Sequence, residues 1–264
     1  MTEITATMVK ELRDKTSAPM MDCKRALQET GGDIEAAIVL LRERGMAQAA
    51  KRAGRETTEG VVLSTVENGL GAIVAVGCET EPVSKNDEFR AFAQKVLDAV
   101  ASDGVEAASR LEQERAELSG KLGENITLAG NARFEAVAGG TIAAYVHPPA
   151  QKIGVLVQVR GGDEELGRKV AMHIAASSPR WIGREDVPED AVTAEREIFA
   201  NSDEVQSKPE QAREKIVEGM LNKRFFGANV LADQEWIHDG SKTVGKALGE
   251  AGAEVLEFER FQLG

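Results

Sequence analysis

Hydrophobic residues recur at helical spacing in three short stretches near the start of the chain. The apolar positions of these stretches are Met8, Val9 and Leu12; Met20, Cys23 and Leu27; and Ile34, Ala37, Ile38 and Leu41. Thr5 is a good N-cap before the first stretch, Pro19 suits the first turn of the second, and Asp33 can cap the third. This pattern predicts a module of three short amphipathic helices.

The sequence indicates an end for the third helix at Gly45, because glycine commonly terminates helices. Residues 46–55 are rich in Ala, Lys and Arg, and we expect them to form a helical linker. Three short helices can bury only a small core. A groove between them is a natural place for a protein partner to bind.

Beyond the linker the hydrophobic pattern becomes that of strands. Apolar runs at 61–66 and 72–76 flank Asn68-Gly69, the strongest short signal for a β-hairpin. A helix should begin at 86–88, and a second helix is expected over 105–122. The apolar stripe of the first of these helices comprises Phe89, Phe92, Ala93, Val96, Leu97 and Val100.

A similar order of elements returns later in the chain. Paired strands are expected at 141–146 and 153–159, around His147-Pro148-Pro149, and a helix should open at Asp163. Two explanations stay open at this point: a duplicated unit, or a common hairpin-plus-helix arrangement that occurs twice.

The last third of the chain adds helices and a final strand. Residues 185–226 are charged and helical with a break at Lys208-Pro209, which predicts a helical hairpin. Residues 255–263 are typical of a strand. The mixture of helices and strands predicts an α+β protein.

Composition limits the classes of protein to consider. No run approaches the roughly 18 apolar residues that a membrane span needs, and the first residues lack the basic start and apolar core of a signal peptide. Cys23 and Cys78 are the only cysteines of the 264 residues and lie in apolar contexts. We therefore expect a cytoplasmic protein without a disulfide framework.

The net charge of −12 argues against direct nucleic-acid binding, which requires a basic face. One local basic cluster could touch an acidic partner or RNA, but we interpret it as solvated helix surface. Its members are Arg42, Arg44, Lys51, Arg52 and Arg55. The acidic balance favours a protein partner.

Segment 240–247 has the spacing of a phosphate-binding loop. However, Ala247 stands where a Ser or Thr should hold Mg²⁺, and no buried strand precedes the segment. We interpret the segment as the start of a helix capped by Ser241, with Val244 and Leu248 facing inward.

The three histidines, His147, His173 and His238, are far apart and share no metal-ligand spacing with the cysteines. His173 falls on a helical apolar stripe and is expected to be packed inside. We therefore predict no metal site, no cofactor and no catalytic residues.

The loop over 78–85 leaves a buried strand, carries two acidic residues and a proline, and enters a helix. The loop could be an ordinary connection stiffened by Pro82. It could instead be a functional site, but composition alone favours the ordinary connection.

Several segments resemble the bacterial elongation factor Ts family, in the same order along the chain. The first is the run Leu12–Leu27, LRDKTSAPMMDCKRAL, which resembles the N-terminal signature of that family. The others are Gly32-Asp33 with Ala37-Ile38 and Leu41-Arg42, Cys78-Glu79-Thr80 with Phe89, residues 171–176, residues 215–219 and residues 241–244. The resemblance covers essentially the whole chain.

The resemblance implies a fold and a division into domains. It implies a ubiquitin-associated-like helical docking domain over residues 1–54. A core of two similar α+β subdomains would follow, over 55–139 and 140–264, with a helical hairpin inserted at about 185–226.

The resemblance also implies an activity and a partner. The family promotes guanine nucleotide exchange on elongation factor Tu, the GTPase that delivers aminoacyl-tRNA to the ribosome. By position, a turn within the 78–85 loop would disturb the Mg²⁺ and phosphate region of the GTPase, and other residues would bind the partner. The turn comprises Thr80, Glu81, Pro82 and Val83, and the binding residues are Met20, Met21 and His147.

One departure from the family concerns the turn itself. The family usually has Thr-Asp-Phe-Val where this chain has Thr80-Glu81-Pro82-Val83. The change removes an aromatic wedge, so exchange here should depend more on displacement of the partner's backbone and on wider contacts. An alternative is a non-exchanging adaptor or chaperone that binds its partner through the N-terminal helices and gives the turn no role.

Overall fold

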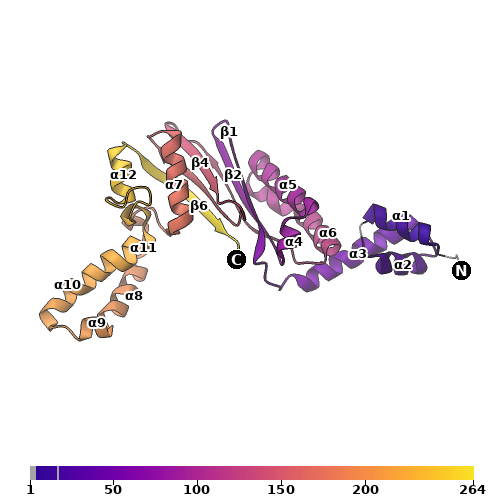
Figure 1. Cartoon of the computed structure of the whole chain (residues 1–264), viewed down its shortest axis with the longest axis horizontal. Helices are drawn as coiled ribbons and strands as arrows, with labels where there is room; N and C mark the ends of the chain where they lie inside the picture. Colours follow the sequence, from indigo (N-terminus) through magenta and orange to yellow (C-terminus); the bar gives the residue numbers. More distant parts are fainter. Residues whose placement is uncertain (1–3, 17) are drawn as a thin grey trace.

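The computed structural model describes residues 4–16 and 18–264; Ser17 and residues 1–3, on which part of the N-terminal motif falls, lie outside the described residues. A helical module at the N-terminal end connects through a long helix to a central body of sheets and helices, and a helical hairpin projects from the far side (Figure 1). The protein is α+β, as predicted.

The N-terminal module has the three predicted helices, α1 (Ala6–Thr16), α2 (Met20–Glu29) and α3 (Ile34–Arg52). Thr5 Oγ1 accepts a hydrogen bond from the Met8 N–H at 3.3 Å, and Asp33 Oδ1 accepts one from the Ala36 N–H at 3.0 Å. Both predicted caps are therefore confirmed. The small core of the module comprises Val9, Leu12, Cys23, Ala26, Leu27 and Ala37.

The predicted stop at Gly45 is wrong, because α3 runs through that residue without interruption. The reason is a close approach between two helices. A Cβ on Gly120, in α6 (Glu112–Leu122), would lie 2.7 Å from the Gly45 Cα. Gly45 is thus a contact residue and not a helix terminator. This backbone contact joins the module to the central body.

The first half of the body is a three-stranded antiparallel sheet covered on one face by helices. The hairpin of β1 (Glu59–Glu67) and β2 (Leu70–Cys78) turns at Asn68 and Gly69, whose φ values are 52° and 78°, as the turn signal predicts. Further along the chain come α4 (Glu81–Ser84), α5 (Asp87–Asp103), the 3₁₀ helix η1 (Val105–Leu111), α6 and β3 (Thr127–Glu135).

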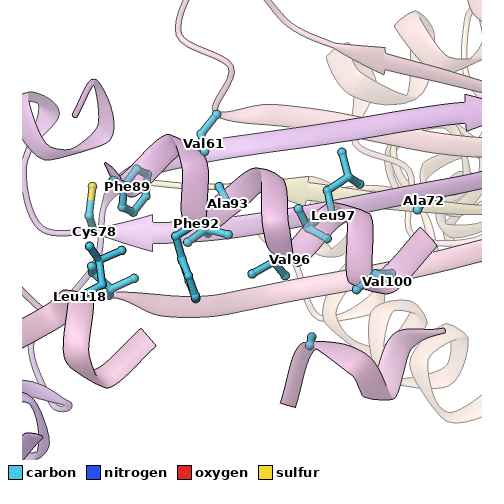
Figure 2. Packing of buried hydrophobic residues seen from close by; sticks show 14 residues of the cluster. Val61, Ala72, Cys78, Phe89, Phe92, Ala93, Val96, Leu97, Val100 and Leu118 are labelled. Carbon is cyan, nitrogen blue, oxygen red and sulfur yellow. The ribbon is translucent and has the colours of Figure 1, made fainter. Parts of the chain in front are cut away.

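Two predictions for this half need correction. The helix expected over 105–122 is a 3₁₀ helix followed by α6, and the strand β3 was not predicted at all. β3 has few apolar residues because it lies at the edge of the sheet and is mostly half-buried. The predicted stripe of α5 is confirmed and packs against β1 and β2 (Figure 2).

The second half repeats the arrangement. It contains β4 (Gly140–Val146), β5 (Ile153–Arg160), α7 (Glu164–Ser177), α12 (Val244–Glu250) and β6 (Glu254–Gln262). The strand order is β4-β5-β6, as it is β1-β2-β3 in the first half. In both halves, the ladder to the third strand shifts register after the sixth residue of the middle strand, at Ala75 and at Gln158. The shared topology and shared irregularity favour duplication over chance recurrence.

The two sheets pack face to face, with the helices on the outside. The residues between the sheets include Val62, Ile73, Phe134, Ile142, Leu156 and Leu263. Glycine is required at the closest points. A Cβ on Gly71 would lie 2.5 Å from Ile142 Cγ2, and a Cβ on Gly154 would collide with Val62. Each glycine is the second residue of its middle strand.

The predicted helical hairpin is present between α7 and α12 and extends away from the body (Figure 1). It has its own core, which includes Phe199, Val205, Val217, Leu221 and Phe225. Its elements are η2 (Arg184–Asp186), α8 (Glu189–Ala200), α9 (Asp203–Gln206), α10 (Glu210–Met220), the π-helical segment η3 (Leu221–Phe226), α11 (Gly227–Asn229) and η4 (Leu231–Asp233).

Candidate functional site

The connection from β2 to α5 carries the predicted turn of residues 80–83. Thr80 precedes the one-turn helix α4, in which Pro82 is the second residue. Thr80, Glu81 and Pro82 are exposed, whereas Val83 is half-buried and packs against the core of the first half. The turn therefore presents three exposed residues on an apolar base.

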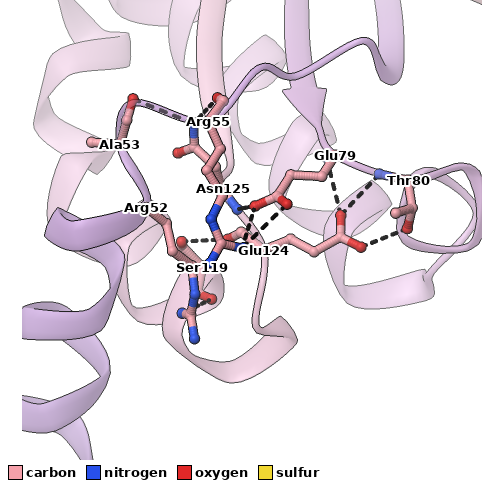
Figure 3. Close-up of polar contacts among 8 residues, drawn as sticks. All are labelled: Arg52, Ala53, Arg55, Glu79, Thr80, Ser119, Glu124 and Asn125. Carbon is pink, nitrogen blue, oxygen red and sulfur yellow. Dashed lines mark hydrogen bonds and ion pairs between the residues drawn. The ribbon is translucent and has the colours of Figure 1, made fainter.

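One carboxylate holds the start of this turn. Glu124 Oε2 accepts hydrogen bonds from the backbone N–H groups of Glu79 and Thr80, each at 3.0 Å, and Glu124 Oε1 accepts the Thr80 hydroxyl at 2.5 Å (Figure 3). These donors follow the last residue of β2 and lie beyond its ladder. Glu124 thus pairs two donors of the turn, both on Thr80, and one on the residue before it.

A second set of bonds joins the turn to the end of α3 (Figure 3). Glu79 Oε1 accepts the Asn125 backbone N–H at 2.6 Å, and both Glu79 oxygens lie 3.3 Å from the Arg55 guanidinium. The buried Asn125 side chain donates to the Arg55 carbonyl at 2.8 Å. The chain that leaves the N-terminal module is therefore bonded to the same residues as the turn.

The charges around the turn keep its acid ionised and its thiol inert. Lys85 donates to Glu81 Oε1 at 2.7 Å, and this hydrogen bond and the lysine charge lower the pKa of Glu81. Beneath the turn, burial and then the charge of Glu124 raise the pKa of Cys78 to about 12. A thiol with that pKa is neutral and unreactive at neutral pH.

His147 lies on the loop between β4 and β5, which approaches the same region. The His147 ring is exposed, and its Nδ1 lies 2.8 Å from the Tyr145 hydroxyl. Farther along this loop, Arg90 of α5 donates to Gln151, and Lys152 pairs with Glu59 at 3.0 Å. The loop is thereby tied to the first half of the body.

Met20 and Met21 lie at the first turn of α2, with 53% and 64% of their surface exposed. Of the three apolar positions predicted for that helix, Cys23 and Leu27 are buried, but Met20 is not. Both methionines instead offer an exposed, flexible apolar surface.

The structure brings some predicted residues together and leaves others apart. The His147 loop neighbours the turn of residues 80–83, since Glu59 pairs with both Lys152 and, in the β ladder, Cys78. The two methionines do not join them: α2 lies at the N-terminal end of the molecule, and α3 and α6 lie between it and α4 (Figure 1).

The rejected phosphate-binding segment is a surface turn leading into α12. Val244 and Leu248 face inward, as predicted. The predicted cap is wrong, because Thr243 Oγ1 accepts the Lys246 N–H at 3.3 Å while Ser241 donates to Asp239. Thr243 lies directly before the helix, where a cap can reach its first N–H groups.

His173 is buried, as predicted, and is held as a neutral ring. Its Nδ1 accepts the Ile237 N–H at 3.4 Å, so Nε2 carries the proton and donates to Gln234 Oε1 at 2.9 Å. Burial lowers the pKa of His173. His173 is a packing residue of the second half, with its ring centroid 5.3 Å from that of Trp236 and the two rings tilted by 33°.

Other candidate sites find no support among the described residues. Across 4–16 and 18–264, no group of three or more His, Cys, Asp or Glu side chains could hold a metal ion. In the basic cluster, ion pairs join Arg42 to Glu117, Arg44 to Glu29 and Arg55 to Glu79. No helix in the described part of the chain is long and apolar enough to cross a membrane.

Sequence reasoning missed Glu124, Glu79 and Asn125, which hold the turn. Glu124 lies 44 residues from Thr80 in the chain, and nothing in local spacing joins the two. The available signal was Gly123, a helix-ending glycine with a φ of 79°, followed by polar residues that had no assigned partners.

Comparison with known proteins bears on the whole chain. The sequence model of the family described as Elongation factor TS matches residues 79–264. Elongation factor Ts of Actinobacillus succinogenes is 46% identical over 268 residues, which cover 100% of this chain and 92% of the relative. The proteins of the same name from Sodalis glossinidius and Escherichia coli O139:H28 are 43% and 42% identical, covering 100% of this chain and 93% of each relative.

Proposed function

Since the chain belongs to the elongation factor Ts family, and so to the translation elongation factors, we propose that it promotes guanine nucleotide exchange on elongation factor Tu. The chain would bind the GDP-bound GTPase, disturb its Mg²⁺ and phosphate region, and let GDP leave. It would act in the cytoplasm, by binding alone, without catalysis, a cofactor or direct contact with nucleic acid.

The observation that carries the proposal is the turn of residues 80–83. It is exposed, rests on Val83, and is fixed at its start by Glu124. A short rigid element can displace groups of a partner, because little of the binding energy is lost in ordering it. Glu81, paired with Lys85 at 2.7 Å, places an exposed carboxylate on the turn that could compete for groups around a cation.

The proposed mechanism follows from the chemistry of Mg²⁺. This ion requires near-ideal octahedral geometry, so a small displacement of its ligands weakens its binding and that of the nucleotide phosphates. Linkage makes the effect mutual: bound GDP must weaken the binding of the exchange factor by the same ratio. The factor therefore acts without making or breaking a covalent bond.

The remaining assignments complete the proposal. Residues 1–54 would be a ubiquitin-associated-like docking domain that binds the GTPase through Met20 and Met21. Residues 55–139 and 140–264 would be the two core subdomains, and His147 would contact the partner from the second. Exposed methionines suit such a contact because their flexible side chains adapt to an apolar surface.

The central test is stopped-flow release of a fluorescent GDP analogue from elongation factor Tu, with and without this protein. We expect the unaltered chain to accelerate release strongly and a chain with Gly and Ala in place of 80–83 to do so at least about tenfold less, a loss equivalent to one strong contact. Equal acceleration by both chains would favour a non-exchanging role for the turn. No acceleration by either would overturn the proposal.

The anchor can be tested separately from the turn. Substituting Met20→Ala and Met21→Ala together should raise the concentration of factor that gives half-maximal release, with little change in the maximal rate. Val39→Ala is a matched control, because Val39 is an apolar residue of the same module and is 55% exposed. A lowered maximal rate with unchanged half-saturation would contradict the anchoring assignment.

A further inference from the structure

We propose that Glu124 is a positioning residue for exchange: its carboxylate holds the turn of residues 80–83 in the conformation that meets the partner. This role rests on the proposed exchange function. Glu124 need not touch the GTPase itself. It would act through Thr80, whose hydroxyl and N–H it binds directly.

The turn cannot hold itself in place. α4 has only four residues, far fewer than an isolated helix needs for stability in water. Its first two residues are exposed, and the half-buried Val83 and the buried Ser84 hold its other end against the body. The start of the turn therefore needs a partner elsewhere in the chain, and the two hydrogen bonds from Thr80 to Glu124 supply it.

The Thr80 hydroxyl is used in an unusual way. Thr80 occupies the N-cap position of α4, where a threonine hydroxyl normally accepts an N–H from the second or third helical residue. The second residue is Pro82, which has no N–H, and the Val83 N–H bonds to the Thr80 carbonyl at 3.2 Å. The hydroxyl is thus free to donate to Glu124.

Glu124 is itself firmly placed. Gly123 ends α6 in the left-handed conformation, at a φ of 79°, and turns the chain toward the end of β2. The buried Ser119 hydroxyl donates to the Glu124 carbonyl, and Asn125 and Ile126, which follow, are 1% and 0% exposed. A carboxylate on so fixed a backbone can impose its geometry on the turn.

The same residues connect the turn to the module that would anchor the partner. Asn125 donates to Glu79 through its backbone and to Arg55, just after α3, through its side chain. The turn and the end of α3 are therefore bonded to consecutive residues, 124 and 125. Binding through the module would deliver the turn in a defined orientation.

The test measures fluorescent GDP release from elongation factor Tu with Glu124→Ala and Glu124→Gln. Loss of one charge-assisted hydrogen bond corresponds to about tenfold or more, so we expect the alanine variant to lower the maximal rate at least that much. Half-saturation should change less than about twofold. The glutamine variant should retain part of the rate, because its amide can still bond the turn without the charge.

A matched control variant shows whether slower GDP release comes from loss of the Glu124 contacts or from loss of any acidic residue in this region. Glu114 lies in the same helix region and pairs with Lys95 across to α5, but it does not contact the turn. Glu114→Ala should leave release unchanged. In addition, Glu124→Ala should make less than about a twofold difference in a chain that already carries Gly and Ala at 80–83, because the two changes remove the same element.

Amide hydrogen exchange measures whether Glu124 holds the start of the turn, and this measurement does not need the GTPase. The N–H groups of Glu79 and Thr80 should exchange faster in Glu124→Ala than in the unaltered chain.

Failure of the unaltered chain to accelerate GDP release would overturn the proposed function. Full acceleration by both Glu124 variants, with the unaltered chain active, would overturn the positioning role alone, as would additive losses in the combined variant.

Discussion

The two halves of the body share one framework but differ in where the chain has been elaborated. Both consist of a hairpin, a helix over its outer face and a third strand beside the middle one. In the second half, β5 passes to α7 through Gly161-Gly162-Asp163, with φ values of 72° and 73° at the glycines. In the first half, the corresponding connection is longer and contains α4, clamped by Glu124.

The second half is elaborated at another point, between its helix and its third strand, where the helical hairpin is inserted. The framework itself is held by apolar packing and close glycine contacts that both halves share. We conclude that the framework supplies stability, whereas the elements that distinguish the halves are the places to look for partner contacts. The following predictions test this division.

The largest effect should come from the glycines of the shared interface. Gly71→Ala and Gly154→Ala each place a Cβ into a side chain of the opposite sheet, and overpacking of this kind costs about 1–3 kcal/mol. Equal losses in the free energy of unfolding, measured by urea denaturation, would indicate that the two glycines occupy equivalent positions in the two halves. Gly219→Ala is the control, since its Cβ meets nothing within 4 Å and alanine favours a helix by about 1 kcal/mol.

Mild acid should destabilise the second half through one buried histidine. His173 is the tenth residue of α7, and its counterpart in α5, Val96, does not titrate. Burial lowers the pKa of His173 from its ordinary 6.5, so the unfolded chain takes up the proton first and stability falls as the pH drops below that value. One such proton accounts for at most about 1.4 kcal/mol per pH unit.

The measurement for this prediction is urea unfolding at several pH values between 5 and 8, about the range in which histidine titrates. His173→Gln should flatten the pH dependence, because it removes the buried imidazole. An unchanged slope in the His173 variant would mean that another group causes the loss.

The two helix caps should contribute equally to stability but unequally to exchange. Asn86 Oδ1 accepts the N–H groups of Glu88 and Phe89, and Asp163 Oδ1 accepts that of Leu166. Replacing either cap by alanine should cost about 1 kcal/mol of unfolding free energy. Only Asn86→Ala should also slow GDP release, because Asn86 lies two residues after the end of α4. Equal slowing by Asp163→Ala would contradict this expectation.

The smallest effect is expected at Pro82. An aromatic side chain carries far more contact area than proline, so Pro82→Phe should raise the maximal rate of GDP release by about threefold, equivalent to less than 1 kcal/mol. Pro82→Ala controls for loss of the ring and should give no gain. A rate that falls in the Phe variant would mean that the stiffness of Pro82 matters more than its contact area.

The sequence was informative wherever structure is determined by neighbouring residues. Thr5 and Asp33 as caps, Asn68-Gly69 as a hairpin turn, and the buried stripe of α5 all depend on residues within a few positions of one another. The predicted position of the exposed turn also rested on the buried strand before it and the helix after it. Such features need no knowledge of the rest of the chain.

The predictions that were wrong or missing concern features that depend on contacts with residues distant in the sequence. Glycine is a residue type that commonly ends helices, but Gly45 lies inside α3, where its backbone contacts Gly120. β3 is recognisable only through its pairing with β2, because its own sequence is largely polar. Glu124 looked like any surface acid, since its three donors lie on a segment more than forty residues away.

The uninterrupted course of α3 has a consequence for how the chain can vary. In an α-helix, one inserted residue lengthens the element by about 1.5 Å and rotates everything on one side by about 100°. Because Gly45 is seated on Gly120 and Arg55 is bonded to Asn125, an insertion or deletion between them would break one contact or the other. The length of this stretch is therefore constrained, as are the buried Ala49 and Arg52, which donates to the Ser119 carbonyl at 3.4 Å.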